Sequence, residues 1–253
     1  MPRPDPISIS PVLGMPLVSA GDDLAALIAA ALDRNRMDLA PGDVLVVAHK
    51  VVSKAEGRTV DLAAVRPGRE ARRVADVVGK DPHLVEIVLA ESRRVVRAAP
   101  GVLVVETHHG FICANAGVDL SNAPSGTAVC LPQDPDASAR RLRRGIGRAT
   151  GVAPAVVVAD SHGRPWRLGT VGLAIGAAGI GAVDDLRGTL DLYGRRLKAT
   201  EVGRIDAVAA AATLVMGEAD EGVPAALVRG ARFSPTAGGA RDALRDPERD
   251  LFR

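Results

Sequence analysis

The chain has 253 residues, 47% of them hydrophobic, which is enough to bury the core of one large domain or two small ones. Aromatic residues make up only 2% and the net charge is +2, so the sequence lacks the ring platforms and the basic stripe of nucleic-acid-binding proteins. The longest apolar stretch, residues 24–32, is far shorter than the roughly 20 residues of a membrane span, so we expect a cytoplasmic protein with no nucleic-acid or membrane partner.

Helices and strands alternate along the first half of the chain. Residues 11–17 contain two prolines and a glycine and predict a turn. Asp22 is placed to cap a helix, because apolar residues follow it at helical spacing as far as Leu32. The continuous apolar run at residues 44–47, in which three of the four residues are valine, predicts a buried strand. Further helices are predicted over residues 68–78 and 84–89, and further strands at residues 95–96 and 102–105.

The second half continues the alternation and then changes character. An Arg-rich helix is predicted over residues 134–149, a buried strand over 155–159 that ends on Asp160, an extended segment over 171–178 and an Ala-rich helix over 205–216. After Gly230 the chain is polar and rich in glycine and proline. We therefore expect a mixed α/β domain over residues 1–230 and a polar tail or linker over 231–253, which deletion after Ser234 would remove at little cost.

The first of four segments with candidate chemistry follows the strand at 44–47. Residues 48–58 contain two lysines, a hydroxyl and an arginine. Lys50 or Lys54 would suit the phosphates of a nucleotide, because the ammonium group is a compact point charge. The alternative is a solvated basic loop, since lysine and arginine mostly cover protein surfaces.

The second and third segments supply oxygen ligands. Residues 113–122 place Asp119 and Asn122 among small residues, where they suit a metal and a nucleotide or simply cap their own backbone. Asp160 and Ser161 follow a hydrophobic run, and hard cations such as Mg²⁺ prefer carboxylate and hydroxyl oxygens. Arg164 can brace an anionic substrate group bidentately. The structural alternative for Asp160 is a cap at a strand-to-loop turn.

The fourth segment, residues 214–221, ends a helix at Gly217 and continues with acidic residues. Because the helix dipole favours cations at this end, Glu218 suggests a compensating positive group such as a metal, or else a solvated acidic turn. No phosphate-binding loop of the G-x-x-x-x-G-K-[ST] type occurs, and the glycines at 176–181 do not form a dinucleotide fingerprint. A nucleoside triphosphate would therefore be held by metals and scattered basic groups.

Four motifs in order resemble the coenzyme F420-0:L-glutamate ligase (F420 γ-glutamyl ligase) family. They are Val-Val-Ser-Lys-Ala-Glu-Gly-Arg at 51–58, residues 114–122, Gly-Arg-Pro-Trp-Arg at 163–167 and Leu-Val-Met-Gly at 214–217. The resemblance extends from about residue 12 to residue 230. It implies GTP-dependent ligation of L-glutamate to the lactyl carboxylate of F420-0 through an acyl phosphate, followed by successive addition of γ-linked glutamates. It also implies a family-specific γ-glutamyl ligase fold and a homodimer with its nucleotide site near the subunit interface.

The resemblance also assigns roles to residues. The divalent metal, Mg²⁺ or Mn²⁺, would be held by Asp119, Asp160, Ser161 and Glu218, and K⁺ is a further candidate ion. GTP would contact Leu13, Gly14, Met15, Pro16, Ser53, Lys54, Asn122, Met216 and Gly217. Lys54 and Arg164 would assist catalysis.

Several positions depart from the family pattern. His49 stands where glutamine is expected, Ser161-His162 where threonine-phenylalanine is usual, and Ala207 where glutamate is expected. The serine keeps an oxygen ligand, so the metal site would be preserved. Thr170 occupies a position that is commonly glutamine, and this change and Ala207 bear on substrate detail and on control of tail length rather than on the reaction class. The chain end at 250–253 also resembles the junction of two-domain relatives, in which a nitroreductase-like domain follows the ligase. Two other functions remain open, namely a metal-dependent nucleotide phosphohydrolase and a non-catalytic deazaflavin-binding module.

Overall fold

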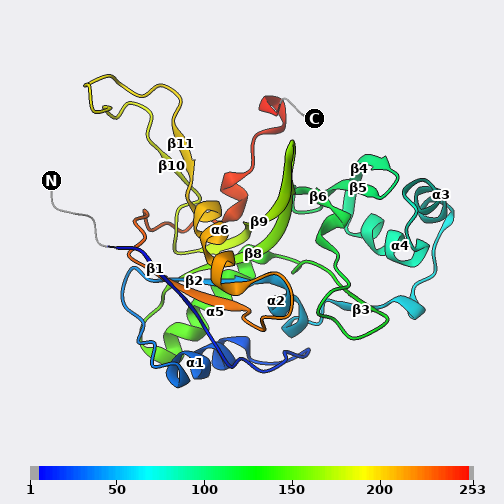
Figure 1. Cartoon of the computed structure of the whole chain (residues 1–253), viewed down its shortest axis with the longest axis horizontal. Coiled ribbons are helices and arrows are strands. Elements are labelled where there is room, and N and C mark those ends of the chain that lie inside the picture. Colours follow the sequence, from blue (N-terminus) through cyan, green and yellow to red (C-terminus); the bar gives the residue numbers. More distant parts are fainter. Residues whose placement is uncertain (1–5, 251–253) are drawn as a thin grey trace.

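A five-stranded sheet forms the centre of the larger of two lobes (Figure 1). The computed structural model describes residues 6–250, and the strands of this sheet run in the order β1–β12–β2–β8–β9. Their bounds are Ser8–Pro11 for β1, Val44–Ala48 for β2, Ala155–Arg164 for β8, Arg167–Ala178 for β9 and Ala225–Arg229 for β12. β2 and β8 are parallel, and the other neighbouring pairs are antiparallel.

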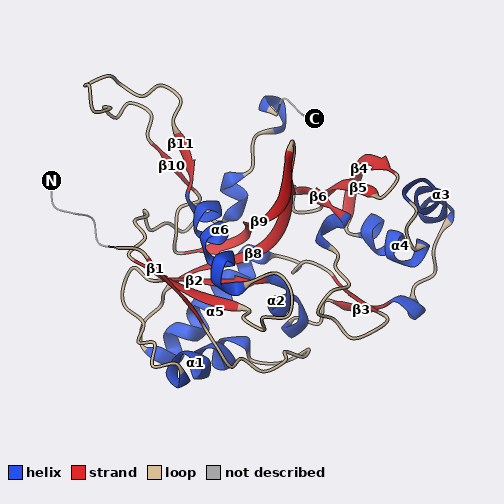
Figure 2. Ribbon diagram, in the orientation of Figure 1, coloured by secondary structure: helices blue, strands red, loops and turns tan. Residues whose placement is uncertain are grey.

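Helices cover both faces of this sheet, which is why its central strands are continuously hydrophobic. Leu45 and Val47 of β2 pack with α1 (Leu24–Arg34) and α5 (Pro135–Thr150) on one face. Val44 and Val46 pack with α6 (Arg204–Met216) on the other face. Figure 2 shows the helices on either side of the red strands.

The smaller lobe is built from residues 59–129. Its helices are α3 (Arg69–Val78) and α4 (Pro82–Ala90), which pack on a three-stranded sheet of β4 (Ser92–Ala99), β5 (Val102–Thr107) and β6 (Ile112–Ala114). The short strands β3 (Thr59–Asp61) and β7 (Thr127–Val129) pair where the chain enters and leaves the lobe. The 3-10 turns η1 (Leu62–Ala64) and η2 (Asn115–Gly117) complete it.

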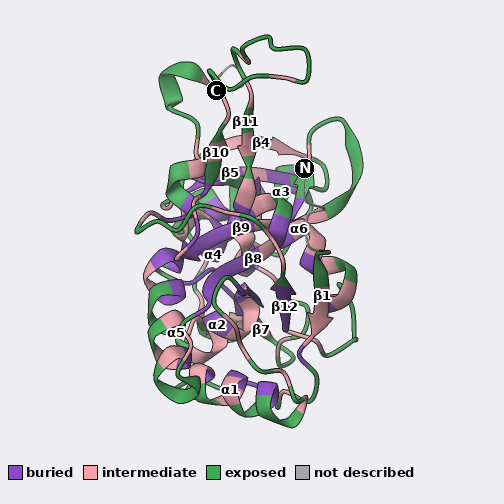
Figure 3. Ribbon diagram, turned by 90° about the vertical axis from the view of Figure 1, so that its left-hand side faces the viewer, coloured by how far each residue is buried: buried purple, intermediate pink, exposed green. Residues whose placement is uncertain are grey.

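A hairpin arm projects from the larger lobe. Its base is the antiparallel pair β10 (Val183–Asp185) and β11 (Glu201–Gly203), and the loop between them extends away from the body of the protein (Figure 1). Figure 3 shows this loop as exposed, in contrast to the buried central strands. Leu192 and Tyr193 in the loop are 96% and 89% exposed.

The mixed α/β class is confirmed, as are the predicted helices that correspond to α1, α3, α4, α5 and α6. Three local predictions are wrong. Residues 49–55 form a helix, α2 (His49–Ala55), and not a loop, and β8 does not end at Asp160 but continues to Arg164 in a hairpin with β9. The cap of α1 is Asp23, whose carboxylate accepts from the backbone of Ala26 at 3.1 Å, rather than Asp22.

The predicted polar tail packs against the domain over part of its length. The carbonyl of Ser234 accepts from the backbone N–H of Gly181 at 2.8 Å. Ala240, in the 3-10 turn η3 (Ala240–Ala243), is 1% exposed, and its N–H donates to the buried carboxylate of Asp136 at 2.7 Å. Residues 234–237 and 245–249, the second range including η4 (Pro247–Arg249), are exposed, so the segment after residue 230 has both packed and exposed parts.

The resemblance to a two-domain junction falls largely on residues 251–253, which lie outside the described part of the chain. Between residues 6 and 250, no helix combines the length and the apolar composition that crossing a membrane requires.

Candidate active site

The pairing of β2 with β8 brings the first candidate residues together. The two strands are parallel, and Ala48 is the register partner of Ala159. The residues that follow these two alanines therefore lie at the same edge of the sheet, where α/β proteins commonly place their sites. These residues are His49, which begins α2, and Asp160 on β8.

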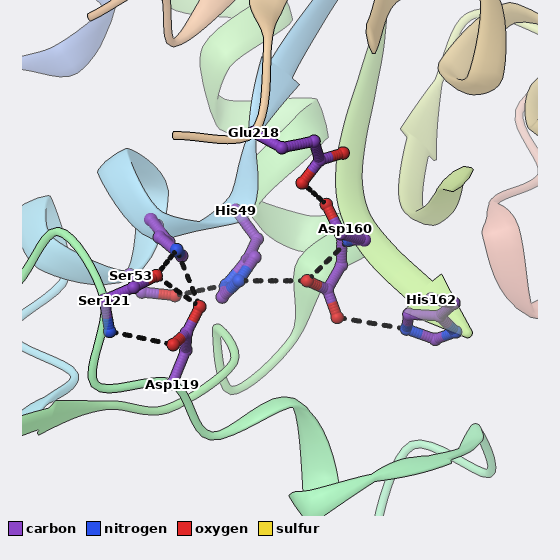
Figure 4. A network of polar contacts seen from close by, with 9 residues as sticks. His49, Ser53, Asp119, Ser121, Asp160, His162 and Glu218 are labelled. Atoms are coloured by element: carbon purple, nitrogen blue, oxygen red, sulfur yellow. Dashed lines mark hydrogen bonds and ion pairs between the residues drawn. The ribbon is translucent and has the colours of Figure 1, made fainter. Parts of the chain in front are cut away.

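Both oxygens of Asp160 have close partners (Figure 4). Oδ1 accepts from the backbone N–H of Ser161 at 2.8 Å and lies 3.2 Å from Nε2 of His49. Oδ2 lies 3.0 Å from Nε2 of His162. Burial alone would raise the pKa of Asp160, but the adjacent imidazoles of His49 and His162 outweigh it and hold this pKa well below its usual range. Asp160 is therefore a buried carboxylate kept in its charged form.

The second carboxylate, Asp119, lies in the loop that returns from the smaller lobe. Its Oδ2 is 2.6 Å from Nζ of Lys50 and accepts from the hydroxyl of Ser121 at 2.9 Å. Burial would raise the pKa of Asp119, but the contacts with Lys50 and Ser121 lower it overall. Since Lys50 and His49 are consecutive on α2, both carboxylates lie near the beginning of that helix (Figure 4).

Further contacts connect these loops to the segment after α6. Nζ of Lys54 donates to the backbone carbonyl of Asn122, and the Asn122 amide donates to the carbonyl of Ala219 at 2.9 Å. Burial, and then the charge of Lys50, lowers the pKa of Lys54. The hydroxyl of Ser161 donates to Glu218 at 2.5 Å. Four of the sequence-predicted segments thus meet at one place, between the two lobes.

The loop that carries Asp119 has an unusual backbone. Asn115, Ala116 and Gly117 have φ values of 51°, 56° and 70°, and Asn122 has a φ of 53°. Asparagine and glycine tolerate this left-handed region, whereas alanine adopts it at a cost of roughly 1–2 kcal/mol. Such strain persists only where the surrounding packing fixes it, and it concentrates at functional sites. Ala116 is 1% exposed, so packing holds this turn.

The structure does not bring every predicted residue into this network. The turn at Leu13, Gly14, Met15 and Pro16 is held by the end of α1, where Arg34 and the C-cap residue Asn35 donate to the carbonyls of Gly14 and Leu13 at 2.9 Å each. Arg164 lies near the tip of the β8–β9 hairpin and donates to the carbonyl of Leu168 at 3.2 Å. Within the described chain, no polar contact connects the turn or Arg164 with either carboxylate. The roles assigned to them remain predictions.

The remaining predicted residues have structural surroundings of their own. Met216 is 7% exposed in the core at the end of α6, and Gly217 caps that helix with a φ of 73°. Ser53 is fully buried, and its Oγ lies 3.5 Å from Nδ1 of His49. Ser53 therefore faces the interior side of α2, whereas Lys54 reaches the loop of Asn122.

Sequence reasoning missed the parts played by His49 and His162. Both histidines stand where the family pattern has other residues, but a single histidine in a basic or polar segment rarely identifies a site. The period-2 alternation of a strand gives a usable signal for His162, since residues 160 and 162 share one face of a strand once β8 is known to continue. His49 carries no such signal, because its burial depends on the helix that follows it.

The donor chemistry of the site suits a divalent metal. Asp119, Asp160, Ser161 and Glu218 offer carboxylate and hydroxyl oxygens, the ligands that Mg²⁺ and Mn²⁺ prefer. The lowered pKa values of Asp119 and Asp160 keep both in the anionic form that a metal needs. Among residues 6–250, no three His, Cys, Asp or Glu side chains form a ready metal cluster.

Comparisons with known proteins agree on one family. Residues 13–230 match the family model described as F420-0:Gamma-glutamyl ligase. The coenzyme F420:L-glutamate ligase of Methanothermobacter thermautotrophicus is 49% identical to the chain, over 98% of this chain and 99% of the relative. Proteins of the same description from Methanopyrus kandleri and Methanocaldococcus jannaschii are 48% and 42% identical, over 98% and 95% of this chain and of the relatives.

Proposed function

The chain belongs to the F420-0:gamma-glutamyl ligase family, and we propose that it joins L-glutamate to the lactyl carboxylate of F420-0 in coenzyme F420 biosynthesis, with GTP as co-substrate. Similarity to ligases over nearly the whole chain identifies an enzyme of the ligase class. The proposal extends to successive addition of γ-linked glutamates and to a cytoplasmic location, where GTP and glutamate are abundant. A non-catalytic deazaflavin-binding module is disfavoured, because both acidic residues of the site are present.

One observation carries the proposal: two ionised carboxylates lie near the beginning of α2, Asp119 paired with Lys50 and Asp160 beside His49, and Lys54 of the same helix reaches the loop that carries Asp119. A carboxylate substrate is a poor electrophile and must be activated before an amine can attack it. Activation by GTP transfers a highly charged phosphoryl group, and fixed cations stabilise that charge. Acidic metal ligands next to lysines provide the two kinds of group that this step needs.

The reaction has two chemical steps. An oxygen of the F420-0 carboxylate attacks the γ-phosphorus of GTP, the bond to the bridging oxygen breaks and GDP leaves, which gives an acyl phosphate. The amine of glutamate then attacks the acyl carbon, inorganic phosphate leaves and the amine loses a proton. Lys54, Lys50 and Arg164 would orient the phosphates of GTP and neutralise their charge.

Asp119, Asp160 and Ser161, with Glu218 nearby, would hold the divalent metal. When bound, Mg²⁺ or Mn²⁺ supplies Lewis-acid charge neutralisation at the phosphate oxygens. Lys50 at present neutralises Asp119, so its ammonium group and a metal would share this carboxylate or exchange places on it. The turn at 13–16 and the chain around Asn122 and Gly217 would contact the nucleotide.

We also propose that the active form is a homodimer. Exposed leucine and tyrosine side chains at the end of a projecting arm are unusual in a monomer, because water contact with large apolar groups is unfavourable. The hairpin tip of β8 and β9 is similar, since Trp166 and Leu168 are 84% and 98% exposed. A second copy of the chain would cover such surfaces.

The test compares GTP turnover in complete reactions with turnover when F420-0 or glutamate is omitted. A ligase should release GDP and phosphate only when both substrates are present. Equal turnover without them would identify a nucleotide phosphohydrolase, the second candidate that the same acidic residues and lysines would suit.

A further inference from the structure

Two imidazoles flank the Asp160 carboxylate, one at each oxygen. Nε2 of His49 lies 3.2 Å from Oδ1, and Nε2 of His162 lies 3.0 Å from Oδ2. The histidines are 2% and 8% exposed, so water competes little for these contacts. One ring comes from the beginning of α2 and the other from β8 itself, and the carboxylate is therefore restrained from two independent elements (Figure 4).

The ring of His49 is itself held in place. Its Nδ1 lies 3.5 Å from Oγ of Ser53, one turn further along α2, and both side chains are buried. A neutral imidazole has one donor nitrogen and one acceptor nitrogen. With the proton on Nε2, the donor faces Asp160 and Nδ1 can accept from the Ser53 hydroxyl. The reverse tautomer would turn a lone pair toward the carboxylate, which is unfavourable.

The contact between His49 and Asp160 is close but is not an aligned hydrogen bond, because Nε2 of His49 has no hydrogen-bond partner of good geometry in the described chain. A buried donor without an aligned partner costs free energy, so packing rather than this contact fixes the ring. The ring consequently limits where the carboxylate can lie. His162 adds the complementary restraint on Oδ2 and lies near a second acid, Asp206, whose carboxylate accepts from the backbone of Ala174 at 3.0 Å.

We infer that His49 and His162 are positioning residues, which fix the orientation of the Asp160 carboxylate so that it is ready to bind the divalent metal. This inference rests on the proposed function, in which Asp160 is a metal ligand. A free carboxylate must lose rotational freedom when it binds a metal, whereas a restrained carboxylate has already lost it. Groups that orient a metal ligand in this way typically change metal affinity by about 10–100-fold.

The experiment measures Mn²⁺ binding directly, by the electron paramagnetic resonance of free Mn²⁺ in titrations with and without GTP. His49→Leu removes the polar ring contact, and His49→Gln keeps a side-chain N–H donor. His83→Leu is the matched control, because His83 is exposed and pairs with Asp81 at 2.8 Å, a residue without a predicted part in the site. His162→Leu tests the other restraint separately.

We expect His49→Leu and His162→Leu to weaken Mn²⁺ binding by about 10–100-fold. His49→Gln should restore most of the affinity, and His83→Leu should bind as the wild type does. In ligase assays the apparent KM for Mn²⁺ should rise in the two leucine variants, with kcat largely recovered at saturating Mn²⁺.

Three results would overturn the inference. Unchanged Mn²⁺ affinity in a folded His49→Leu or His162→Leu variant would show that the histidine only fills space in the core. Equal losses in His49→Leu and His49→Gln would show that the donor is not what matters. If the wild-type protein itself bound no Mn²⁺, with or without GTP, the metal role in the proposed function would fail first. Should His49→Leu not fold, His162→Leu decides the question.

Discussion

Asp160 differs from Asp119 in how far water reaches it, since their side chains are 12% and 40% exposed. A buried charge must be compensated by its neighbours, and for Asp160 the compensation comes from two histidines rather than from a lysine or arginine. Because the pKa of Asp160 is depressed, this carboxylate remains ionised through the whole range in which the protein is expected to work. Its charge is thus available to a metal without a proton having to leave.

Asp160→Asn keeps the size of the side chain and removes the charge. We expect ligase turnover to fall by about 10²–10³-fold, as when a group that stabilises transferring charge is lost. The rise in melting temperature on adding Mn²⁺ and GTP to the wild type should nearly disappear in the variant.

Asp81→Ala provides the structural comparison, because Asp81 caps α4 through the backbone of His83 at 2.7 Å. The Asp81→Ala substitution should lower the free energy of unfolding by about 1 kcal/mol and leave ligase turnover almost unchanged. If Asp160→Asn behaved like Asp81→Ala, Asp160 would be a structural residue and the metal assignment would be wrong.

The two cysteines give a prediction about reactivity. Burial, with the negative charge of Asp160, raises the pKa of Cys113 to about 12, and burial with Glu91 raises that of Cys130 to about 11. At pH 8 only about one thiol in a thousand or fewer is then a thiolate, the form that reacts with alkylating agents. Iodoacetamide at pH 8 should label neither cysteine in the folded protein and both in urea. Rapid native labelling of Cys113 would mean that the lobes separate more readily than their contacts indicate.

At the scale of elements, the order of helices and strands followed largely from hydrophobic periodicity, but the details of the site did not. The strand at 44–47 is a continuous apolar run and the helix at 205–216 is a long Ala-rich segment, and both form as predicted. α2 has only seven residues and no side-chain cap, so no local sequence signal predicts this helix. The extension of β8 past Asp160 is polar and is formed only through pairing with β9, which periodicity cannot detect.

The acidic residues and lysines of the site were predictable as types, because clusters of polar residues after buried segments are conspicuous. Their partners were not. His49 meets Asp160 only through the parallel register of β2 and β8, and Lys50 meets Asp119 across 69 positions of sequence. Contacts of this kind depend on tertiary structure, and no local sequence pattern predicts which distant residues will meet.

The packing of the C-terminal segment leads to a prediction at this scale. Truncation after Ser234 removes Ala240 and Leu244 from the core and removes a hydrogen bond to the buried carboxylate of Asp136. We expect a loss of about 2–4 kcal/mol in the free energy of unfolding, from lost apolar burial and a lost charge-assisted bond. Truncation after Arg245 removes mostly exposed residues and serves as the control in urea unfolding. Equal stability of the two truncated proteins would restore the loose-tail interpretation.

In the molecule as a whole, the site lies where the two lobes meet, and the exposed arm projects from the larger lobe away from the body of the protein. If the arm joins two subunits, the double substitution Leu192→Glu and Tyr193→Glu should convert a dimer into a monomer. The reason is that moving a charged side chain from water into an apolar interface costs several kcal/mol or more of free energy. Sedimentation velocity provides the measurement. Val77→Glu on α3 places the same charge on another exposed apolar residue and should leave assembly unchanged. A wild-type protein that is monomeric and fully active would contradict the dimer proposal.

Mass spectrometry of the deazaflavin detects the proposed product itself. Purified protein is incubated with F420-0, L-glutamate, GTP and Mn²⁺, and both the deazaflavin and the released GDP are quantified. We expect F420 species that carry one or more added glutamyl residues, with one GDP formed for each glutamate joined. Unchanged F420-0 in a reaction where GTP is consumed would contradict the proposed function.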